Sequence, residues 1–175
     1  MNKIIGIIAE YNPFHLGHIY QINEIKKIYP DSTIIVIISP SFTQRGDISI
    51  INKYNKTLIC LENNIDLVVE LPYPYATQSS DIFAKGAIEI LNKLNIDTLV
   101  FGSESNDVET LKNLANISNN NTNYHNKVKE YLNKGYNYPT AMSKALYDIT
   151  NVNINTPNDL LALSYLKVIN KYNYN

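Results

Sequence analysis

Residues 6–22 read GIIAEYNPFHLGHIYQI, and the order of their parts decides the fold. The apolar, β-branched run KIIGIIA, residues 3–9, leads into a polar loop that contains Pro13. His15 and His18 follow, with Gly17 between them, and apolar residues then recur at helical spacing over residues 17–28. A buried strand, a short loop and a helix in this order predict the first half of a βαβ unit.

Three further apolar runs repeat the pattern, at residues 33–38, 66–71 and 97–101. Short runs of this kind are typical of strands buried on both faces of a parallel sheet. Amphipathic helical patterns over residues 52–63 and 80–94 lie between them. We therefore predict an α/β fold with a Rossmann-like, doubly wound parallel sheet, whose ligands bind beyond the carboxyl ends of the strands.

Helical patterns alone fill the rest of the chain. They span residues 107–117, 124–134, 140–148 and 158–171, with a polar turn at Asn119–Asn121. We expect residues 1–106 to form the α/β core. Residues 107–175 are expected to form a C-terminal helical extension of the same domain.

The composition narrows the function classes. With 15 Lys and Arg against 16 Asp and Glu, the chain has no basic excess of the kind that marks a dedicated nucleic-acid binder. The single cysteine, Cys60, excludes an internal disulfide and is expected to be a small buried hydrophobe. The first apolar run is too short for a secretory signal or a membrane span, so we predict a cytoplasmic protein without a membrane partner.

His15 and His18 are the candidate catalytic residues. At positions i and i+3 they share one face at the entrance of a helix, where free N–H groups and the positive dipole end favour an anion. Each imidazole can donate a hydrogen bond to a phosphate oxygen. The alternatives are an ordinary surface pair or half of a metal site, but no third cluster of Cys or His accompanies them, and His125 lies in a polar stretch and is expected to be exposed.

Three cations lie in the second loop and at the start of the helix that follows it. Arg45 suits a phosphate, a carboxylate or an RNA backbone, and otherwise it is a solvated loop charge. Lys53 and Lys56 open the next helix, where a cation is slightly unfavourable for the helix dipole. That position weakly indicates an anionic partner for them.

The third and fourth loops carry aromatic and acidic residues. Tyr73 and Tyr75 are candidates for stacking on bases, or else they cover the end of the sheet. Glu70, Asp81 and Glu104 lie near the same edge. One of the three is a candidate ligand for the Mg²⁺ that accompanies ATP, although the sequence does not say which.

Several strings resemble a known family. HLGH after a first strand matches the His-x-Gly-His signature of the nucleotidyltransferase superfamily, and GIIAEYNPFHLGH, residues 6–18, is far more specific. It resembles the opening of the tRNA(Met) cytidine acetate ligase family. The resemblance continues in SPSFTQRGDISIINKYNKT, in DLVVELPYPYATQSSDIFAKGAIEILNKLNIDTLVFGSE and in NTPNDLLALSYLK, and so spans nearly the whole chain.

The resemblance implies a HIGH-type nucleotidyltransferase that activates acetate with ATP and Mg²⁺, giving acetyl-adenylate and pyrophosphate. The acetyl group would then pass to N4 of the wobble cytidine in elongator tRNA(Met). ATP, acetate and this tRNA are the implied partners. The implied ATP-binding residues are Ile7, Ile8, Ala9, Glu10, Tyr11, Asn12, Pro13, Phe14, His15, Leu16, Gly17, His18, Ile19, Tyr20, Gly102 and Asn158.

Two of these residues have a simpler interpretation. Gly102 follows a strand and allows close backbone approach to a nucleotide, but it is also an ordinary turn glycine. Asn158 is equally a helix cap. The family's second phosphate-binding motif, a Ser/Thr-Ile-Arg segment, is expected beyond the last residue of this sequence.

Two other functions therefore remain open. One is a small-molecule adenylyltransferase. The other is a catalytically silent module that binds a nucleotide or RNA.

Overall fold

The structure is a computed structural model that describes residues 2–172 and 174. It divides into two compact units, residues 1–101 and residues 102–175. The division falls a few residues before the boundary that we expected after residue 106. Each unit is described separately below.

The first unit is built on a four-stranded parallel sheet. Its strands are β1 (Ile4–Ala9), β2 (Thr33–Ile38), β3 (Leu67–Glu70) and β4 (Thr98–Val100), in the order β3-β2-β1-β4. β2 lies beside β1 and β3 lies beside β2, whereas β4 lies on the other side of β1. This reversal creates a switch point between the carboxyl ends of β1 and β4, which is the usual ligand position in such sheets.

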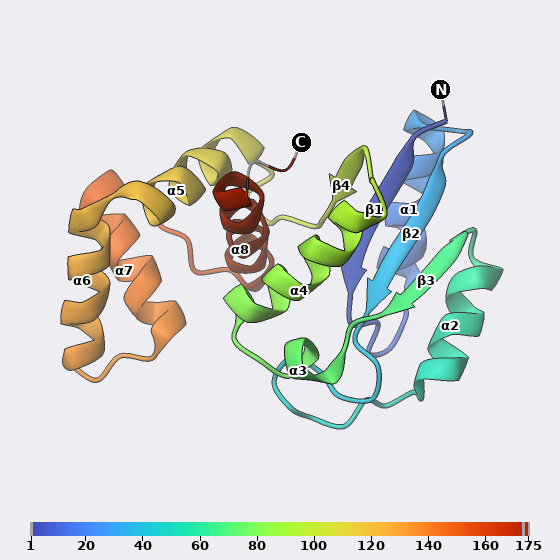
Figure 1. Cartoon of the computed structure of the whole chain (residues 1–175), viewed down its shortest axis with the longest axis horizontal. Helices are drawn as coiled ribbons and strands as arrows, with labels where there is room; N and C mark the ends of the chain where they lie inside the picture. The colour runs from blue at the N-terminus through green and yellow to red at the C-terminus, as the bar shows by residue number, and fades with distance from the viewer. Residues whose placement is uncertain (1, 173, 175) are drawn as a thin grey trace. The chain divides into compact units, whose positions relative to one another are not determined.

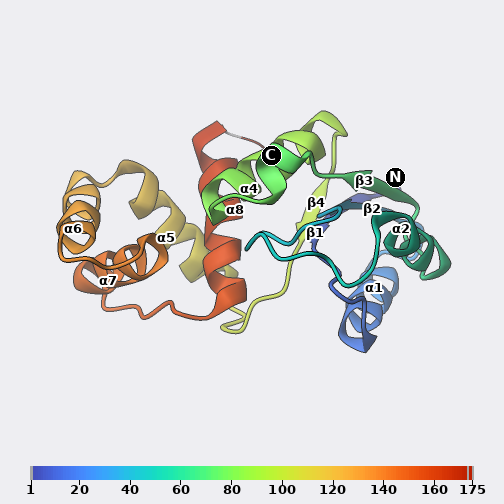
Figure 2. The same ribbon diagram turned by 90° about the horizontal axis from the view of Figure 1, so that it is seen from below.

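Helices cover both faces of the sheet, which confirms the doubly wound α/β prediction (Figures 1 and 2). The helices α1 (Leu16–Ile28) and α2 (Lys53–Glu62) lie on one face. The short helix α3 (Tyr73–Ala76) precedes α4 (Ser80–Lys93), which lies on the other face. The buried cluster between the sheet and the first two helices contains Ile5, Ile7, Tyr11, Ile22, Ile25, Ile34, Val36, Ile38, Cys60 and Ile65.

Two aspartates help to set the register of the edge strands. The carboxylate of Asp97 accepts a hydrogen bond from the backbone N–H of Ile4 at 2.7 Å, and Asp97 N donates to Ile4 O at 2.8 Å. Asp66 makes the same pair of contacts with Ile34, at 2.8 and 3.0 Å. Each aspartate thus pairs the start of its strand with the start of the neighbouring strand. A slip by one residue would turn the partly buried side chains of the short strand to the opposite face.

Cys60 is buried and free, as predicted. Burial raises the pKa of its thiol to about 11, although the nearby Lys56 works in the opposite direction. The thiol therefore stays protonated near neutral pH and is a poor nucleophile. Its role in this unit is packing.

The second unit consists of four helices, α5 (Val108–Asn120), α6 (Thr122–Asn133), α7 (Tyr138–Thr150) and α8 (Pro157–Tyr172). The expected three-residue polar turn is reduced to one residue, Asn121. It ends α5, and its side chain accepts a hydrogen bond from Tyr124 N at 3.0 Å to cap α6. One asparagine that serves both helices makes a longer turn unnecessary.

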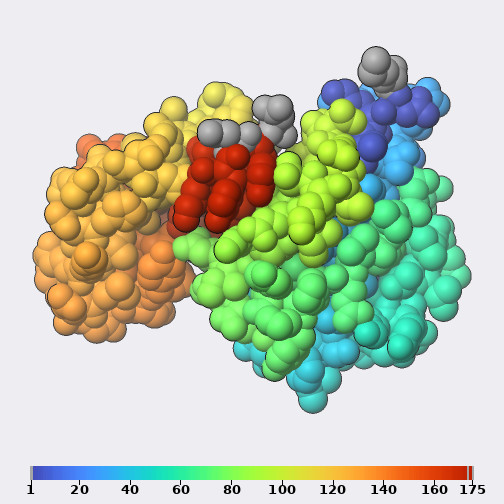
Figure 3. All heavy atoms as spheres, in the orientation of Figure 1, coloured from blue at the N-terminus to red at the C-terminus, as the bar shows by residue number. Residues whose placement is uncertain are grey.

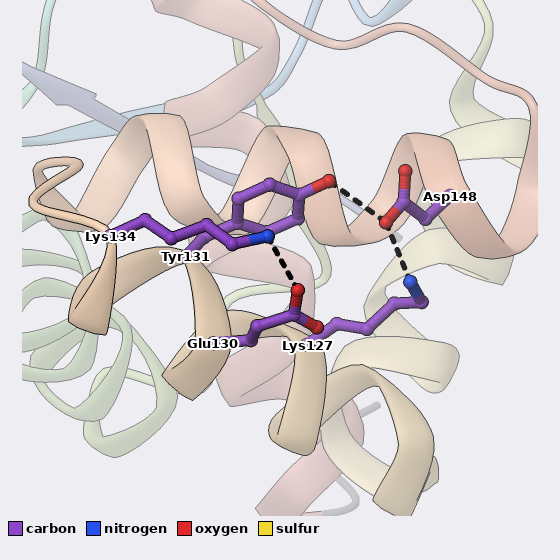
Figure 4. A network of polar contacts seen from close by, with 5 residues as sticks. All are labelled: Lys127, Glu130, Tyr131, Lys134 and Asp148. Atoms are coloured by element: carbon purple, nitrogen blue, oxygen red, sulfur yellow. Dashed lines mark hydrogen bonds and ion pairs between the residues drawn. The ribbon is translucent and has the colours of Figure 1, made fainter.

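A polar network joins α6 to α7 (Figure 4). Asp148 on α7 accepts hydrogen bonds from Lys127 at 2.7 Å and from the hydroxyl of Tyr131 at 2.9 Å. On α6 itself, Lys134 donates to Glu130 at 2.6 Å. Two of the lysines on α6 are therefore neutralised by carboxylates.

No helix in the described part of the chain is both long and apolar enough to cross a membrane.

Gly86 lies where α4 meets α3, and it supports a stability prediction. A Cβ at this position would lie 2.5 to 2.7 Å from the Cγ, Cδ1 and Cβ atoms of Tyr75. We expect Gly86→Ala to destabilise the protein by about 1–3 kcal/mol through overpacking, which outweighs the roughly 1 kcal/mol that alanine gains in a helix. Urea unfolding measures the difference.

Asn92→Ala, at an exposed position on the same helix, is the control and should change the free energy of unfolding little. A Gly86→Ala variant that is as stable as the unaltered chain, or more stable, would contradict the packing argument.

Candidate functional site

The loop that follows β1 leads to the two histidines. Tyr11, a buried residue of this loop, packs against its aromatic rings. Tyr11 has a positive φ of 46° and is 2% exposed. Its ring meets those of Phe14 and His18 edge-on, with centroids 4.8 and 4.6 Å apart. Burial raises the pKa of its phenol, and the core around it is apolar. This residue therefore supports the loop, and its side chain offers no open contact to a ligand.

The two histidine rings are stacked at the start of α1. Their centroids are 3.7 Å apart and their planes make an angle of 25°. His15 is the N-cap residue, and its Nδ1 accepts a hydrogen bond from Gly17 N at 3.1 Å. The Nδ1 of His18 accepts from the backbone N–H of His15, also at 3.1 Å. The helix terminus thus holds both rings through its own backbone.

These hydrogen bonds assign the tautomers. A ring nitrogen that accepts an N–H bond carries no proton, so each neutral imidazole has its proton on Nε2. Neither Nε2 of His15 or His18 has a hydrogen-bond partner among the described residues. The pair therefore presents two N–H donors beside the N-terminus of a helix, where an anion is favoured.

Gly17 makes this arrangement sterically available. A Cβ at Gly17 would lie 3.0 Å from Cε1 and 3.1 Å from Nδ1 of His15. The group that lies closest to this glycine is thus the His15 ring itself.

The surroundings of His18 lower the pKa of its imidazole. Burial of its ring, followed by the proximity of His15, lowers the pKa of His18 from 6.5 to about 4. At neutral pH His18 is therefore uncharged. It acts as a hydrogen-bond donor and contributes no formal charge.

Glu10 and Asn12 tie this loop to the one that follows β2, a connection that the sequence did not indicate. Glu10 Oε1 accepts from Gln44 N at 2.5 Å, and Asn12 Oδ1 accepts from Ile50 N at 2.7 Å and from the Ser49 hydroxyl at 3.1 Å. The partners lie more than thirty positions away, and no local pattern reveals a contact of that range.

Lys56 does not lie on an open anion-binding surface. It is 1% exposed, and its ammonium donates to the carbonyl oxygens of Glu10 at 2.7 Å and Ser39 at 3.1 Å. Burial lowers its pKa. The expected anion or RNA contact is not supported for Lys56, because its buried ammonium joins the carbonyl oxygens that follow the ends of β1 and β2.

The other two cations of this region differ from each other. Lys53 forms a salt bridge with Glu70 at 2.7 Å, so its charge is already paired. Arg45 is exposed in a tight turn, where Gly46 has a φ of +88° and Thr43 N donates to Asp47 O at 2.9 Å. Arg45 has no ion-pair partner among the described residues and remains a candidate anion contact.

The carboxylates proposed for Mg²⁺ do not form a metal cage. Glu70 pairs with Lys53, and Glu104 lies in the second unit, where its carboxylate binds backbone N–H groups. Asp81 lies in the first turn of α4. Over residues 2–172 and 174, no group of three His, Cys, Asp or Glu side chains could hold a metal ion.

Asn158 and Glu104 form a cap at the start of α8. Glu104 Oε1 accepts from the side-chain amide of Asn158 at 2.9 Å and from its backbone N at 3.2 Å, and Oε2 accepts from Asp159 N at 3.0 Å. Burial works to raise the pKa of Glu104, but these hydrogen bonds outweigh it and lower the pKa. Asn158 is therefore engaged in capping, and a nucleotide contact through its amide would have to displace Glu104.

The remaining expected contacts are spread over several environments. Gly102 is exposed at the start of the second unit, and a Cβ there would meet nothing within 4 Å. Within Ile7–Tyr20, Ile7 is buried, whereas Leu16 and Tyr20 are exposed. Other side chains of that segment with partial or full exposure are Ile8, Ala9, Glu10, Asn12, Pro13, Phe14 and Ile19.

The aromatic residues of the third loop have separate roles. Tyr75 packs against Gly86 on α4. Tyr73 is 59% exposed, with its ring edge-on to Phe42. His125 is exposed, as expected.

Comparison with known proteins agrees with this geometry. A family model described as HIGH Nucleotidyl Transferase matches residues 2–175. A tRNA(Met) cytidine acetate ligase of Mesomycoplasma hyopneumoniae strain J is 49% identical and covers 97% of this chain and 54% of that protein. The ligase of Fusobacterium nucleatum is 46% identical, with 98% and 42% covered.

A solved structure is similar as well. Thermotoga maritima TmcAL, crystallised with alpha-thio ATP, matches with a TM-score of 0.89 and 35% identity over 99% of this chain and 44% of that one. The chain spans about half the length of the relatives that it matches. By its family model, its relatives and its fold, the chain belongs to the HIGH nucleotidyltransferase family.

Proposed function

We propose that the chain is the ATP-binding part of a tRNA(Met) cytidine acetate ligase. It binds ATP at the start of α1 and joins acetate to AMP with release of pyrophosphate. The whole protein then transfers the acetyl group to N4 of the wobble cytidine of elongator tRNA(Met). The names of the relatives and the ATP analogue bound to TmcAL support this proposal. Within this chain, the observation that carries it is the stacked pair of His15 and His18, whose Nε2–H groups have no hydrogen-bond partner among the described residues.

The chemistry of the first step suits neutral histidines. A carboxylate oxygen of acetate attacks the α-phosphorus of ATP, and the bond from that phosphorus to pyrophosphate breaks. No proton is transferred, so no general base is required, and a His18 with a pKa of about 4 remains competent. The two Nε2–H groups and the N-terminus of α1 stabilise the negative charge that builds up on the phosphate oxygens.

In this proposal, Mg²⁺ binds together with the phosphates of ATP. Protein sites for this ion commonly combine one or two carboxylates with substrate phosphates. Glu70 is paired with Lys53, Glu104 caps α8 in the second unit, and the described residues hold no group of three His, Cys, Asp or Glu side chains that could bind the ion without the nucleotide.

Acetate-dependent exchange of pyrophosphate into ATP tests the reaction. We expect exchange with acetate, and a decrease of about 100-fold in His15→Ala and His18→Ala, because removing one preorganised donor typically costs that much. Exchange that requires a phosphomonoester in place of acetate would favour a small-molecule adenylyltransferase. ATP binding without exchange would favour a catalytically silent module.

Gly17→Ala tests the role of the ring position. The added Cβ pushes the His15 imidazole away from the Gly17 N–H, so the two donors no longer point together. We expect about a tenfold weaker affinity for ATP, equivalent to about 1.4 kcal/mol, in a calorimetric titration. Lys27→Ala, at an exposed position in the last turn of α1, should bind ATP normally. An unchanged affinity in Gly17→Ala would separate the histidine stack from ATP binding.

His18 also makes stability depend on pH. Because burial holds its pKa in the folded protein near 4, below 6.5, the unfolded chain takes up the proton first as the pH falls. The free energy of unfolding should decrease between pH 6.5 and pH 4 by on the order of 1 kcal/mol, after a discount for the half-exposed ring.

His18→Asn is the matched control, since its amide oxygen can still accept from His15 N while the titrating group is gone. Urea unfolding at several pH values should give a smaller slope for this variant. Equal slopes would show that His18 titrates at its ordinary pKa.

A further inference from the structure

The chain between β2 and α2 forms a small hairpin, residues 41–49. Phe42 and Ile48 form an antiparallel bridge between its two arms, and Thr43 N donates to Asp47 O at 2.9 Å across its tip. The hairpin lies beyond the carboxyl ends of the strands, at the lower edge of the first unit in Figures 1 and 3. Its backbone hydrogen bonds give the tip a defined shape.

This hairpin is joined by hydrogen bonds to the loop that leads from β1 to the histidines. Gln44 N, at the tip, donates to Glu10 Oε1 at 2.5 Å. Ile50 N, just after the hairpin, donates to Asn12 Oδ1 at 2.7 Å. Both acceptors lie between the end of β1 and the histidine pair. Arg45 follows Gln44 directly, so its backbone is held beside this loop.

Arg45 is the single arginine among the 15 basic residues of the chain. Its side chain is exposed and forms no salt bridge with any described residue, Asp47 included. The two other cations of this region are engaged, because Lys53 pairs with Glu70 at 2.7 Å and Lys56 is buried between two carbonyl oxygens. Of these three cations, Arg45 is therefore the one that an external anion can reach.

A guanidinium at this position suits a carboxylate. Its N–H groups form a planar fork that matches the two oxygens of a carboxylate, whereas a lysine ammonium binds as a point charge. Each carboxylate oxygen has two lone-pair positions, so a carboxylate held by the fork keeps a lone pair free for attack on phosphorus. A substrate carboxylate can therefore be bound and remain reactive.

The strand order places this hairpin on one side of the proposed ATP site. β4 lies on one side of β1 and β2 lies on the other, and the switch point expected to hold the nucleotide lies between β1 and β4. The hairpin follows β2, so it reaches the histidine loop from the side away from β4. We therefore expect the partner of Arg45 to be the second substrate and not the nucleoside.

Acetate needs a cation in the proposed reaction. It is an anion that must approach the triphosphate of ATP, and like charges repel each other at the short distance that attack requires. His18 is uncharged near neutral pH, and the proposed role of the histidine pair is to stabilise phosphate charge. A separate positive group is therefore required to offset the charge of acetate.

We propose that Arg45 binds the carboxylate of acetate and positions it for attack on the α-phosphorus of ATP. The inference rests on the proposed function and assigns a residue to its second substrate. In the step itself, a carboxylate oxygen forms the new bond to phosphorus while the bond from phosphorus to pyrophosphate breaks. Arg45 transfers no proton and keeps its charge throughout.

Because the sequence has one arginine, an arginine reagent reports on this side chain alone. Phenylglyoxal modifies guanidinium groups, and mass spectrometry of peptides measures the rate of modification at Arg45. The chain is loaded with α,β-methylene ATP, which cannot transfer its AMP, and acetate, acetamide or a short RNA hairpin is added at constant ionic strength. We expect acetate at about ten times its dissociation constant to slow modification about tenfold. Acetamide, the neutral isostere, should have little effect.

Two kinds of result would overturn the inference. The first is no protection by acetate, or protection by acetamide that is equally strong. The second is full protection by the ATP analogue before acetate is added, or protection by the RNA hairpin alone, because Arg45 would then contact a phosphate.

Exchange of pyrophosphate into ATP by substituted chains gives a second measurement. Arg45→Gln should raise the KM for acetate about 10- to 100-fold and change the calorimetric affinity for ATP less than about twofold, as expected for the loss of hydrogen bonds to a charged group. Arg45→Lys should raise that KM less, since it keeps the charge and loses the fork. Lys85→Gln, which removes a lysine paired with Glu89 on α4, is the control and should leave both constants unchanged. Weaker ATP binding by Arg45→Gln with an unchanged KM for acetate would contradict the proposal.

The two measurements separate this inference from the proposed function. Protection of Arg45 by acetate in a chain that lacks exchange would support the acetate site and count against the proposed reaction. Acetate-dependent exchange without protection of Arg45 would support the reaction and overturn the role of this residue.

Discussion

Two backbone N–H groups at the start of α1, those of His15 and Gly17, hold the candidate site together. Each donates to the Nδ1 of a histidine, so one short segment fixes the tautomer, the stacking and the direction of both rings. These groups would otherwise need solvent or another cap, because the first N–H groups of a helix have no partner within it. The same two contacts therefore stabilise the helix terminus and leave the Nε2–H group of each ring without a partner among the described residues.

The sheet gives that helix terminus its position. β1 lies between β2 and β4, and the chain reverses direction across the sheet at β1, so the loop with the histidines leaves from the switch point. Tyr11 packs beneath the loop, and Lys56 binds the carbonyl oxygens of Glu10 and Ser39 from the side. These buried contacts thus fix the loop next to the two rings to the ends of β1 and β2.

The sequence predicted the strands, the order of the elements and the histidine pair, because apolar periodicity and the strand–loop–helix transition are local signals. It could not predict the burial of Lys56, nor that Glu104 would be the partner of Asn158 at the start of α8. A lysine near the start of an amphipathic helix looks exposed, and its burial depends on carbonyl groups contributed by two distant loops. Asn158 is likewise fixed by Glu104, which is fifty-four positions away. Pairings over that distance become visible only when the fold is known.

The charge state of His18 bears on how the site treats a charged product. Burial and the proximity of His15 keep His18 uncharged near neutral pH, so it contributes an N–H donor and no formal charge. Neutral N–H groups stabilise charge that develops on a phosphate without holding a product polyanion as strongly as a fixed cation does. A site built on such donors suits a reaction whose charged product must leave.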